Sequence, residues 1–174
     1  MSIKATPLGH SRILSVGTYR PKRAVPNSEI VDRIESTDEW IQQRTGIESR
    51  RFAGDDETVI SMAKAACEMA LKRAKLSIED IDTVILSTIS YPFQAPSAAT
   101  ELINELGNPK AAAFDISAAC AGFCYGVAMA SDLVRSGTSR NVLVIGVEKL
   151  SDYTDPDDRA TAFIFADGAG AVII

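Results

Sequence analysis

The sequence has few cysteines, a single histidine and no long apolar run, and each shortage excludes a class of protein. Its 174 residues include three cysteines, an odd number without regular spacing, which argues against a small secreted scaffold held by disulfides. No run of about 18 consecutive apolar residues occurs, so no membrane-spanning helix is expected. The first residues also lack the apolar core of a signal peptide. We therefore expect a cytoplasmic protein that does not bind membranes.

Metal binding and nucleic-acid binding are also disfavoured. Cys120 and Cys124 would share one face of a helix, but no second cysteine pair or nearby histidine completes a set of metal ligands. The one histidine, His10, lies in a polar stretch before the first predicted strand, which is typical of a solvated loop rather than a catalytic residue. The formal net charge of −5 disfavours nonspecific binding to nucleic acid. We expect no bound metal and no nucleic-acid partner.

The remaining composition is that of one globular α/β domain. Hydrophobic residues make up 46% of the chain and charged residues 24%, and a chain of this length can bury a core. Apolar segments typical of strands alternate with segments of helical periodicity, which predicts an α/β fold with a largely parallel sheet. The predicted strands cover residues 12–19, 83–89, 111–116, 141–147 and 168–174.

The predicted helices are marked by capping residues and by the spacing of apolar side chains. Asn27 or Ser28 is expected to cap the first helix, Ser36 or Thr37 the second, and Gly46 to end the second. The predicted helices cover residues 28–34, 38–45, about sixteen residues after Thr58, 97–106, and 120–135.

The most informative stretch is 112–126, where a short apolar strand leads through small residues into a helix whose first turn carries Cys120. A thiol at a helix start faces unpaired N–H groups and the positive end of the peptide dipoles, which favour the nucleophilic thiolate. Small neighbours such as Ala119 and Gly122 leave room for a sharp turn and for a substrate to reach the sulfur. A cysteine that only packs in the core is the alternative. The context favours a nucleophile that accepts an acyl group from a thioester, with its own backbone N–H stabilising the oxyanion.

The same stretch resembles a known family. The run at 117–123, Ser-Ala-Ala-Cys-Ala-Gly-Phe, is similar to the active-site segment of β-ketoacyl-acyl-carrier-protein synthase III, a condensing enzyme of the thiolase superfamily. Segments 38–47, 155–159 and 165–171 resemble the family in the same order. The resemblance covers essentially the whole chain but only the first half of the family's usual length. It implies that residues 1–174 are the N-terminal half of a longer enzyme, with 1–11 as a mobile leader and the C-terminal half absent.

The resemblance implies both a fold and an activity. The fold is thiolase-like, a layered α/β/α arrangement with a five-stranded mixed sheet and a buried helix that carries the cysteine. The activity is that of an acyltransferase, which condenses acyl-CoA with malonyl-acyl carrier protein in the initiating, decarboxylative step of fatty-acid biosynthesis. The family's histidine and asparagine that assist decarboxylation lie in its second half, so this chain alone is expected to lack full activity. The family is homodimeric, and coenzyme A arrives as part of the substrate, so no cofactor is implied.

The resemblance also assigns substrate-binding residues. Trp40, Arg44 and Arg159 match positions at the coenzyme A entrance, where an indole and guanidinium groups can enclose an adenine. Ser36 matches a position that contacts the nucleotide and is typically threonine. Ordinary packing and surface ion pairing are the competing interpretations. The acyl pocket is assigned to Ile89, Ala95, Leu150 and Phe165.

Ala95 carries a prediction of substrate preference. In the family this position is contributed across the dimer interface, and some members have a large aromatic residue there. The small side chain predicts a pocket that admits acyl chains longer or more branched than acetyl. Core packing is the competing explanation for Ile89, Leu150 and Phe165.

Two rival functions remain open on the sequence. A polyketide-type starter synthase, or another acyltransferase of the thiolase superfamily, would use the same cysteine chemistry. A noncatalytic half-domain that serves as a binding or dimerisation module is the alternative outside enzyme chemistry.

Overall fold

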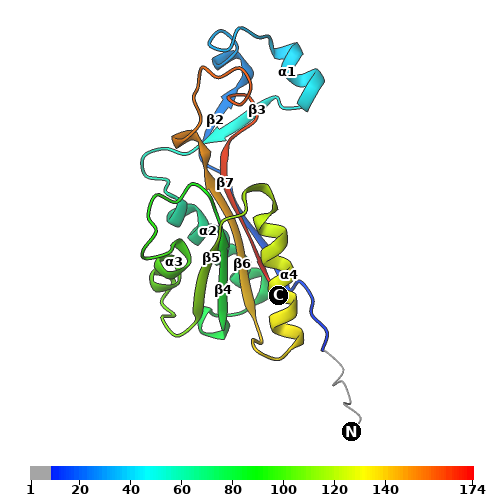
Figure 1. Cartoon of the computed structure of the whole chain (residues 1–174), viewed down its shortest axis with the longest axis vertical. Coiled ribbons are helices and arrows are strands. Elements are labelled where there is room, and N and C mark those ends of the chain that lie inside the picture. The colour runs from blue at the N-terminus through cyan, green and yellow to red at the C-terminus, as the bar shows by residue number, and fades with distance from the viewer. Residues whose placement is uncertain (1–8) are drawn as a thin grey trace.

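The computed structural model describes residues 9–174 and contains a five-stranded sheet with helices on both faces (Figure 1). The strands lie in the order β1-β7-β6-β4-β5. Their bounds are β1 (Ser15–Tyr19), β4 (Thr83–Ser87), β5 (Ala112–Ile116), β6 (Val142–Lys149) and β7 (Asp167–Ile173).

The sheet is mixed. β4 pairs in parallel with both β5 and β6, whereas β7 runs antiparallel to β6 and to β1. The strand pattern predicted a largely parallel sheet, and this prediction is wrong for the direction of β7. The mixed sheet implied by the resemblance is confirmed. Because β4, β5 and β6 are parallel, their carboxyl ends meet at one end of the sheet, which is where α/β proteins usually place ligands.

Helices α2 (Val59–Ala74) and α3 (Ala98–Leu106) cover one face of the sheet. The sixteen-residue helix predicted from the apolar spacing after Thr58 is confirmed as α2, and Thr58 caps it, with its side chain accepting a hydrogen bond from the Ser61 N–H. Cys67 lies on the buried stripe of α2, where burial raises the pKa of its thiol. This cysteine is therefore a packing residue.

The first predicted helix, over 28–34, is wrong. Only a short 3-10 turn forms there, η1 (Asn27–Glu29). The Oδ1 atom of Asn27 accepts a hydrogen bond from the buried Arg50 guanidinium, and its amide donates to Asp38 and to the Ile47 carbonyl. These tertiary bonds occupy the side chain that was expected to cap a helix.

A small unit extends beyond one end of the main sheet (Figure 1). In it, β2 (Arg23–Pro26) pairs antiparallel with β3 (Ser49–Phe52), and α1 (Asp38–Thr45) lies beside them. Thr37 caps α1, and Gly46 ends it in the left-handed conformation with φ of 72°, both as predicted. The short strand β2 was not predicted.

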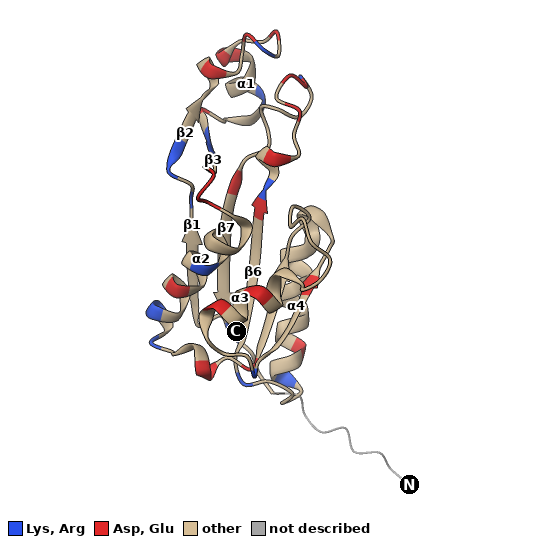
Figure 2. Ribbon diagram, turned by 90° about the vertical axis from the view of Figure 1, so that its left-hand side faces the viewer, with Lys and Arg blue, Asp and Glu red and all other residues tan. Residues whose placement is uncertain are grey.

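Helix α4 (Gly122–Arg135) covers the other face of the sheet and is buried on that side only. Gly126 allows close contact, since a Cβ there would lie 2.9 Å from Val144 Cγ1. On the outer side, Tyr125 is 56% exposed and Met129 is 43% exposed. The ribbon of α4 carries charge only in its last turns (Figure 2). The resemblance implied a buried helix, and within residues 9–174 this helix is buried only on the side that faces the sheet.

Residues 1–8 of the predicted leader lie outside the described residues. The following residues run beside the last turns of α4, where the Gly9 N–H donates to the Arg135 carbonyl at 3.0 Å and the Ser11 and Ser131 hydroxyls are hydrogen bonded. His10 is exposed in this segment. Since α4 rises about 1.5 Å per residue, its length places His10 roughly 20 Å from the turn that precedes the helix. Among residues 9–174, no helix is long and apolar enough to cross a membrane.

Candidate functional site

Cys120 lies in a 3-10 turn, η3 (Ala119–Ala121), between β5 and α4. The prediction placed it in the first turn of the helix itself, but α4 begins two residues later, at Gly122. Ala119 has a φ of 44°, in the left-handed region that disfavours residues other than glycine. Such strain is concentrated at functional sites, where it aims a side chain that regular structure could not place. The turn leaves the Cys120 side chain exposed.

Gly122 lets this turn sit directly on the end of β4. A Cβ at this position would lie 1.9 Å from the Oγ atom of Ser87, the last residue of β4, and 3.1 Å from its Cβ. No side chain fits there unless the Ser87 side chain or one of the two segments shifts. The small residue expected to make room around the cysteine therefore also fixes the position of the turn.

A cavity of about 550 Å³ opens beside Cys120. Segments that follow the three parallel strands line it, with Ile89 after β4, Cys120 after β5 and Leu150 after β6, while Phe165 precedes β7. The structure thus brings the predicted nucleophile and three of the predicted acyl-pocket residues around one space. Glu148, Thr154 and Thr161 also line the cavity and were not predicted.

Glu148 orients the loop that follows β4. Its Oε1 atom accepts the Ile89 N–H at 3.0 Å, and its Oε2 atom accepts the hydroxyls of Thr88, at 3.3 Å, and Ser90. The carboxylate therefore fixes the backbone from which Ile89 reaches the cavity. The sequence signal for this residue was a single acidic side chain directly after the apolar run at 142–147.

Asp167 fixes the backbone segments beside the cavity residues Leu150 and Phe165. This residue is 7% exposed, and its carboxylate accepts the Ala53 N–H at 2.7 Å, the Ser151 N–H at 2.9 Å and the Ser151 hydroxyl at 2.6 Å. These bonds tie the start of β7 to the segment after β3 and to the segment that supplies Leu150. Buried carboxylates require such partners.

Trp40 and Arg44 of the small unit form a cluster with Arg159, which belongs to the segment that joins β6 to β7. The Cζ atoms of Arg44 and Arg159 lie 4.2 Å and 5.8 Å from the centre of the indole ring, within cation–π range. The indole also meets Phe163 edge-on, with 5.3 Å between ring centroids. A flat aromatic ring with two cations is chemically suited to a ligand that has an aromatic base and phosphate groups.

The carboxylate beside Arg159 is held in its ionised form. The Thr161 hydroxyl and the Ala160 N–H donate to Asp158 and lower the pKa of its carboxyl group. Asp158 also lines the cavity, so its rim carries a fixed negative charge.

Ala95 is the one predicted acyl-pocket residue that does not line the cavity, and Ser36 is the predicted coenzyme A contact that lies outside the Trp40 cluster. Ser36 lies directly before the cap of α1, and its buried hydroxyl has no hydrogen-bond partner within residues 9–174. Ala95 is exposed in the loop between β4 and α3 and does not reach the cavity of its own chain.

Comparisons with known proteins agree on one family. The family model for 3-oxoacyl-[acyl-carrier-protein] synthase III matches residues 114–174. The β-ketoacyl-[acyl-carrier-protein] synthase III of Kocuria rhizophila is 54% identical over 168 residues, which are 97% of this chain and 47% of that protein. The mycobacterial enzyme of the same name from Mycobacterium tuberculosis is 51% identical over 162 residues, 93% of this chain and 48% of that protein.

Solved structures give the same result. The priming β-ketosynthase of the R1128 polyketide biosynthetic pathway has a TM-score of 0.93 and 44% identity, over 99% of this chain and 52% of that one. The 3-oxoacyl-[acyl-carrier-protein] synthase III of Aquifex aeolicus has a TM-score of 0.89 and 44% identity, over 92% of this chain and 52% of that one. The chain spans about half the length of the curated relatives it matches. It belongs to the β-ketoacyl-[acyl-carrier-protein] synthase III family and corresponds to the N-terminal half of its members.

Proposed function

We propose that the chain is the acyl-accepting half of a cytoplasmic condensing acyltransferase that starts fatty-acid biosynthesis. The observation that carries the proposal is an exposed cysteine on a strained turn, at a cavity built from the carboxyl ends of three parallel strands. A nucleophile in such a place can meet a substrate without rearrangement of the sheet.

The first half-reaction is transfer of an acyl group from acyl-CoA to Cys120. The thiolate attacks the thioester carbonyl carbon, a new carbon–sulfur bond forms, and the bond to the coenzyme A sulfur breaks. Coenzyme A leaves as a thiolate and takes up the proton that Cys120 released. Negative charge on the carbonyl oxygen in the tetrahedral intermediate is stabilised by the backbone N–H of Cys120.

Coenzyme A is proposed to bind at the Trp40 cluster. Its adenine would stack on the indole, and Arg44 and Arg159 would meet the ring and the phosphates. Ser36 lies at the start of the same helix and is the fourth proposed contact. The acyl group would enter the cavity lined by Leu150 and its neighbours.

The second half-reaction is condensation with malonyl-acyl carrier protein, in which loss of CO₂ yields the carbanion that attacks the acyl-cysteine. It needs acid–base groups beside the sulfur. The chain's one histidine, His10, lies at the far end of α4. Condensation is therefore assigned to the whole enzyme, and this chain alone is expected to stop at the acyl-cysteine.

The enzyme is proposed to act as a homodimer. Within residues 9–174, β5 is an edge strand that pairs only with β4, so its outer backbone groups can pair with a second copy. The neighbouring loop carries Phe93, which is 64% exposed, and Ala95. A dimer formed along β5 would cover this loop and bring Ala95 toward the partner's cavity.

A second candidate is the priming step of polyketide synthesis. The similarity to the R1128 priming ketosynthase, at 44% identity and a TM-score of 0.93, favours it specifically. Rates with acyl carrier proteins from fatty-acid and polyketide systems separate the two pathways, because the loading chemistry at Cys120 is shared.

The experiment that tests loading measures release of free coenzyme A during incubation with acetyl-CoA. The wild-type chain should release one equivalent per acylated cysteine. Cys120→Ala should abolish release, whereas Cys124→Ala, which removes the other exposed thiol one helical turn away, should not. Equal release by Cys120→Ala and wild type would overturn the proposed function and leave a binding or dimerisation module as the better account.

A further inference from the structure

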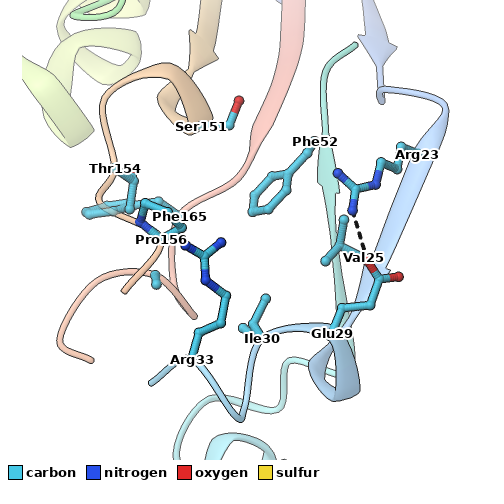
Figure 3. Close-up of a pocket in the computed structure, with 11 residues that line it drawn as sticks. Arg23, Val25, Glu29, Ile30, Arg33, Phe52, Ser151, Thr154, Pro156 and Phe165 are labelled. Carbon is cyan, nitrogen blue, oxygen red and sulfur yellow. Dashed lines mark hydrogen bonds and ion pairs between the residues drawn. The ribbon is translucent and has the colours of Figure 1, made fainter. Parts of the chain in front are cut away.

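A second cavity, of about 270 Å³, lies between the small unit and the segment that joins β6 to β7 (Figure 3). Its apolar lining comes from both sides. Val25, Ile30 and Phe52 belong to the small unit, and Ala162 and Phe165 come from the joining segment. Neither the proposed acyl loading nor the coenzyme A cluster uses this space.

The two cavities share a wall. Thr154 and Phe165 line the second cavity and also the one that contains Cys120. The Phe165 residue is 36% exposed, so its ring is not locked in a closed core. The partition between the cavities therefore includes side chains that face both spaces, one of them a partly exposed aromatic ring.

The charged side chains around the second cavity are already paired. Arg23 binds Glu29 at 2.9 Å, and Arg33 binds Asp157 at 2.7 Å. Because each guanidinium has a carboxylate partner, the cavity has no unpaired cation to attract a phosphate or another anion. An uncharged, apolar occupant fits this lining best.

We propose that the second cavity receives the distal end of a long acyl chain held on Cys120, and that Phe165 is the gate between the two spaces. The inference rests on the proposed function. Short acyl groups stay in the first cavity, and longer ones displace the ring and continue between the small unit and the joining segment. Each methylene buried there improves binding about fourfold, the effect of removing one CH₂ group from water.

Two substitutions test this route from opposite directions. Ile30→Trp fills the second cavity, and Phe165→Ala removes the gate. Acylation of Cys120 is measured by mass spectrometry with acetyl-CoA and with decanoyl-CoA. Ile30→Trp should slow decanoylation at least about tenfold, which corresponds to about two buried methylenes, and leave acetylation within about twofold. Phe165→Ala should raise the decanoyl-to-acetyl ratio, and Ile30→Trp should cancel that gain in the double variant.

The controls separate the inference from the proposed function. Ile13→Trp makes the same change at a residue that is 56% exposed and lines neither cavity, and it should alter neither rate. If the wild type is acetylated but Phe165→Ala leaves the ratio of decanoylation rate to acetylation rate unchanged, the second cavity does not receive the chain. That result stands even where Ile30→Trp fails to fold. Absence of any acylation in the wild type would overturn the proposed function and this inference together.

Discussion

Replacing Gly122 with alanine tests how the cysteine turn is held. The new Cβ would lie 1.9 Å from Ser87 Oγ and 3.1 Å from Ser87 Cβ, so the Ser87 side chain, the turn or the end of β4 must shift. Overpacking of this kind costs about 1–3 kcal/mol, and alanine recovers at most about 1 kcal/mol of backbone entropy, so a net loss of about 1–2 kcal/mol is expected. For a domain of this size each kcal/mol corresponds to about 2–4 °C, which predicts a melting temperature lower by about 5 °C. Acylation of Cys120 should slow as well, because the turn is displaced.

Thermal unfolding of a four-variant set measures the effect. Ser87→Gly removes both clashing atoms, so the double variant should recover at least about 1 kcal/mol relative to the sum of the single changes. Gly170→Ala is the matched control, since a Cβ there would have no atom within 4 Å, and it should not lower the melting temperature. A Gly122→Ala variant as stable as the wild type, or one that Ser87→Gly does not rescue, would refute the close approach of the turn to β4.

Three further predictions concern reactivity, binding and acid stability. A thiol reagent should modify Cys120 in the folded protein and leave Cys67 unmodified until unfolding, since burial raises the pKa of the Cys67 thiol; fast folded-state labelling of Cys67 would contradict this. Arg44→Met keeps most of the aliphatic stem but removes the cation over the indole, and should weaken coenzyme A binding by calorimetry about two- to fivefold; unchanged affinity would place the nucleotide elsewhere. Hydrogen bonds from the Tyr19 hydroxyl and from backbone N–H groups lower the pKa of Glu57 in the folded state. Its ionised carboxylate therefore stabilises the fold fully above the unfolded-state pKa of about 4.3, and this stabilisation is lost as the pH falls through the lower pKa of the folded state. Glu57→Gln should reduce the dependence of the free energy of unfolding on pH in this acid range.

The helices and their ends were largely predictable from the sequence. The apolar stripe that follows Thr58 and the glycine that ends α1 are local signals, and local signals do not depend on the rest of the fold. The first helix failed because a distant partner, Arg50, takes the oxygen of Asn27 that a cap would need. Pairing of β2 with β3 was missed for the same reason, since the two strands are brought together by the tertiary structure.

The candidate site was predictable as a set of residues but not as a geometry. The strand, turn and helix pattern supplied Cys120, the resemblance supplied Leu150 and Phe165, and the fold places them around one cavity because parallel strands end together. The positive φ of Ala119 leaves no mark in the sequence, since alanine is not selected for that conformation. Likewise, the role of Glu148 depends on which backbone groups face it after β4 and β6 pair.

The central claim is that Cys120 accepts an acyl group directly from a thioester. The most direct measurement is tandem mass spectrometry of the wild-type chain after brief incubation with acetyl-CoA, with the modified residue located by fragmentation. We predict the acetyl group on Cys120, with Cys124 and Cys67 unmodified. An acetyl group found on Cys124 and not on Cys120, or no acetylated cysteine at all, would contradict the claim.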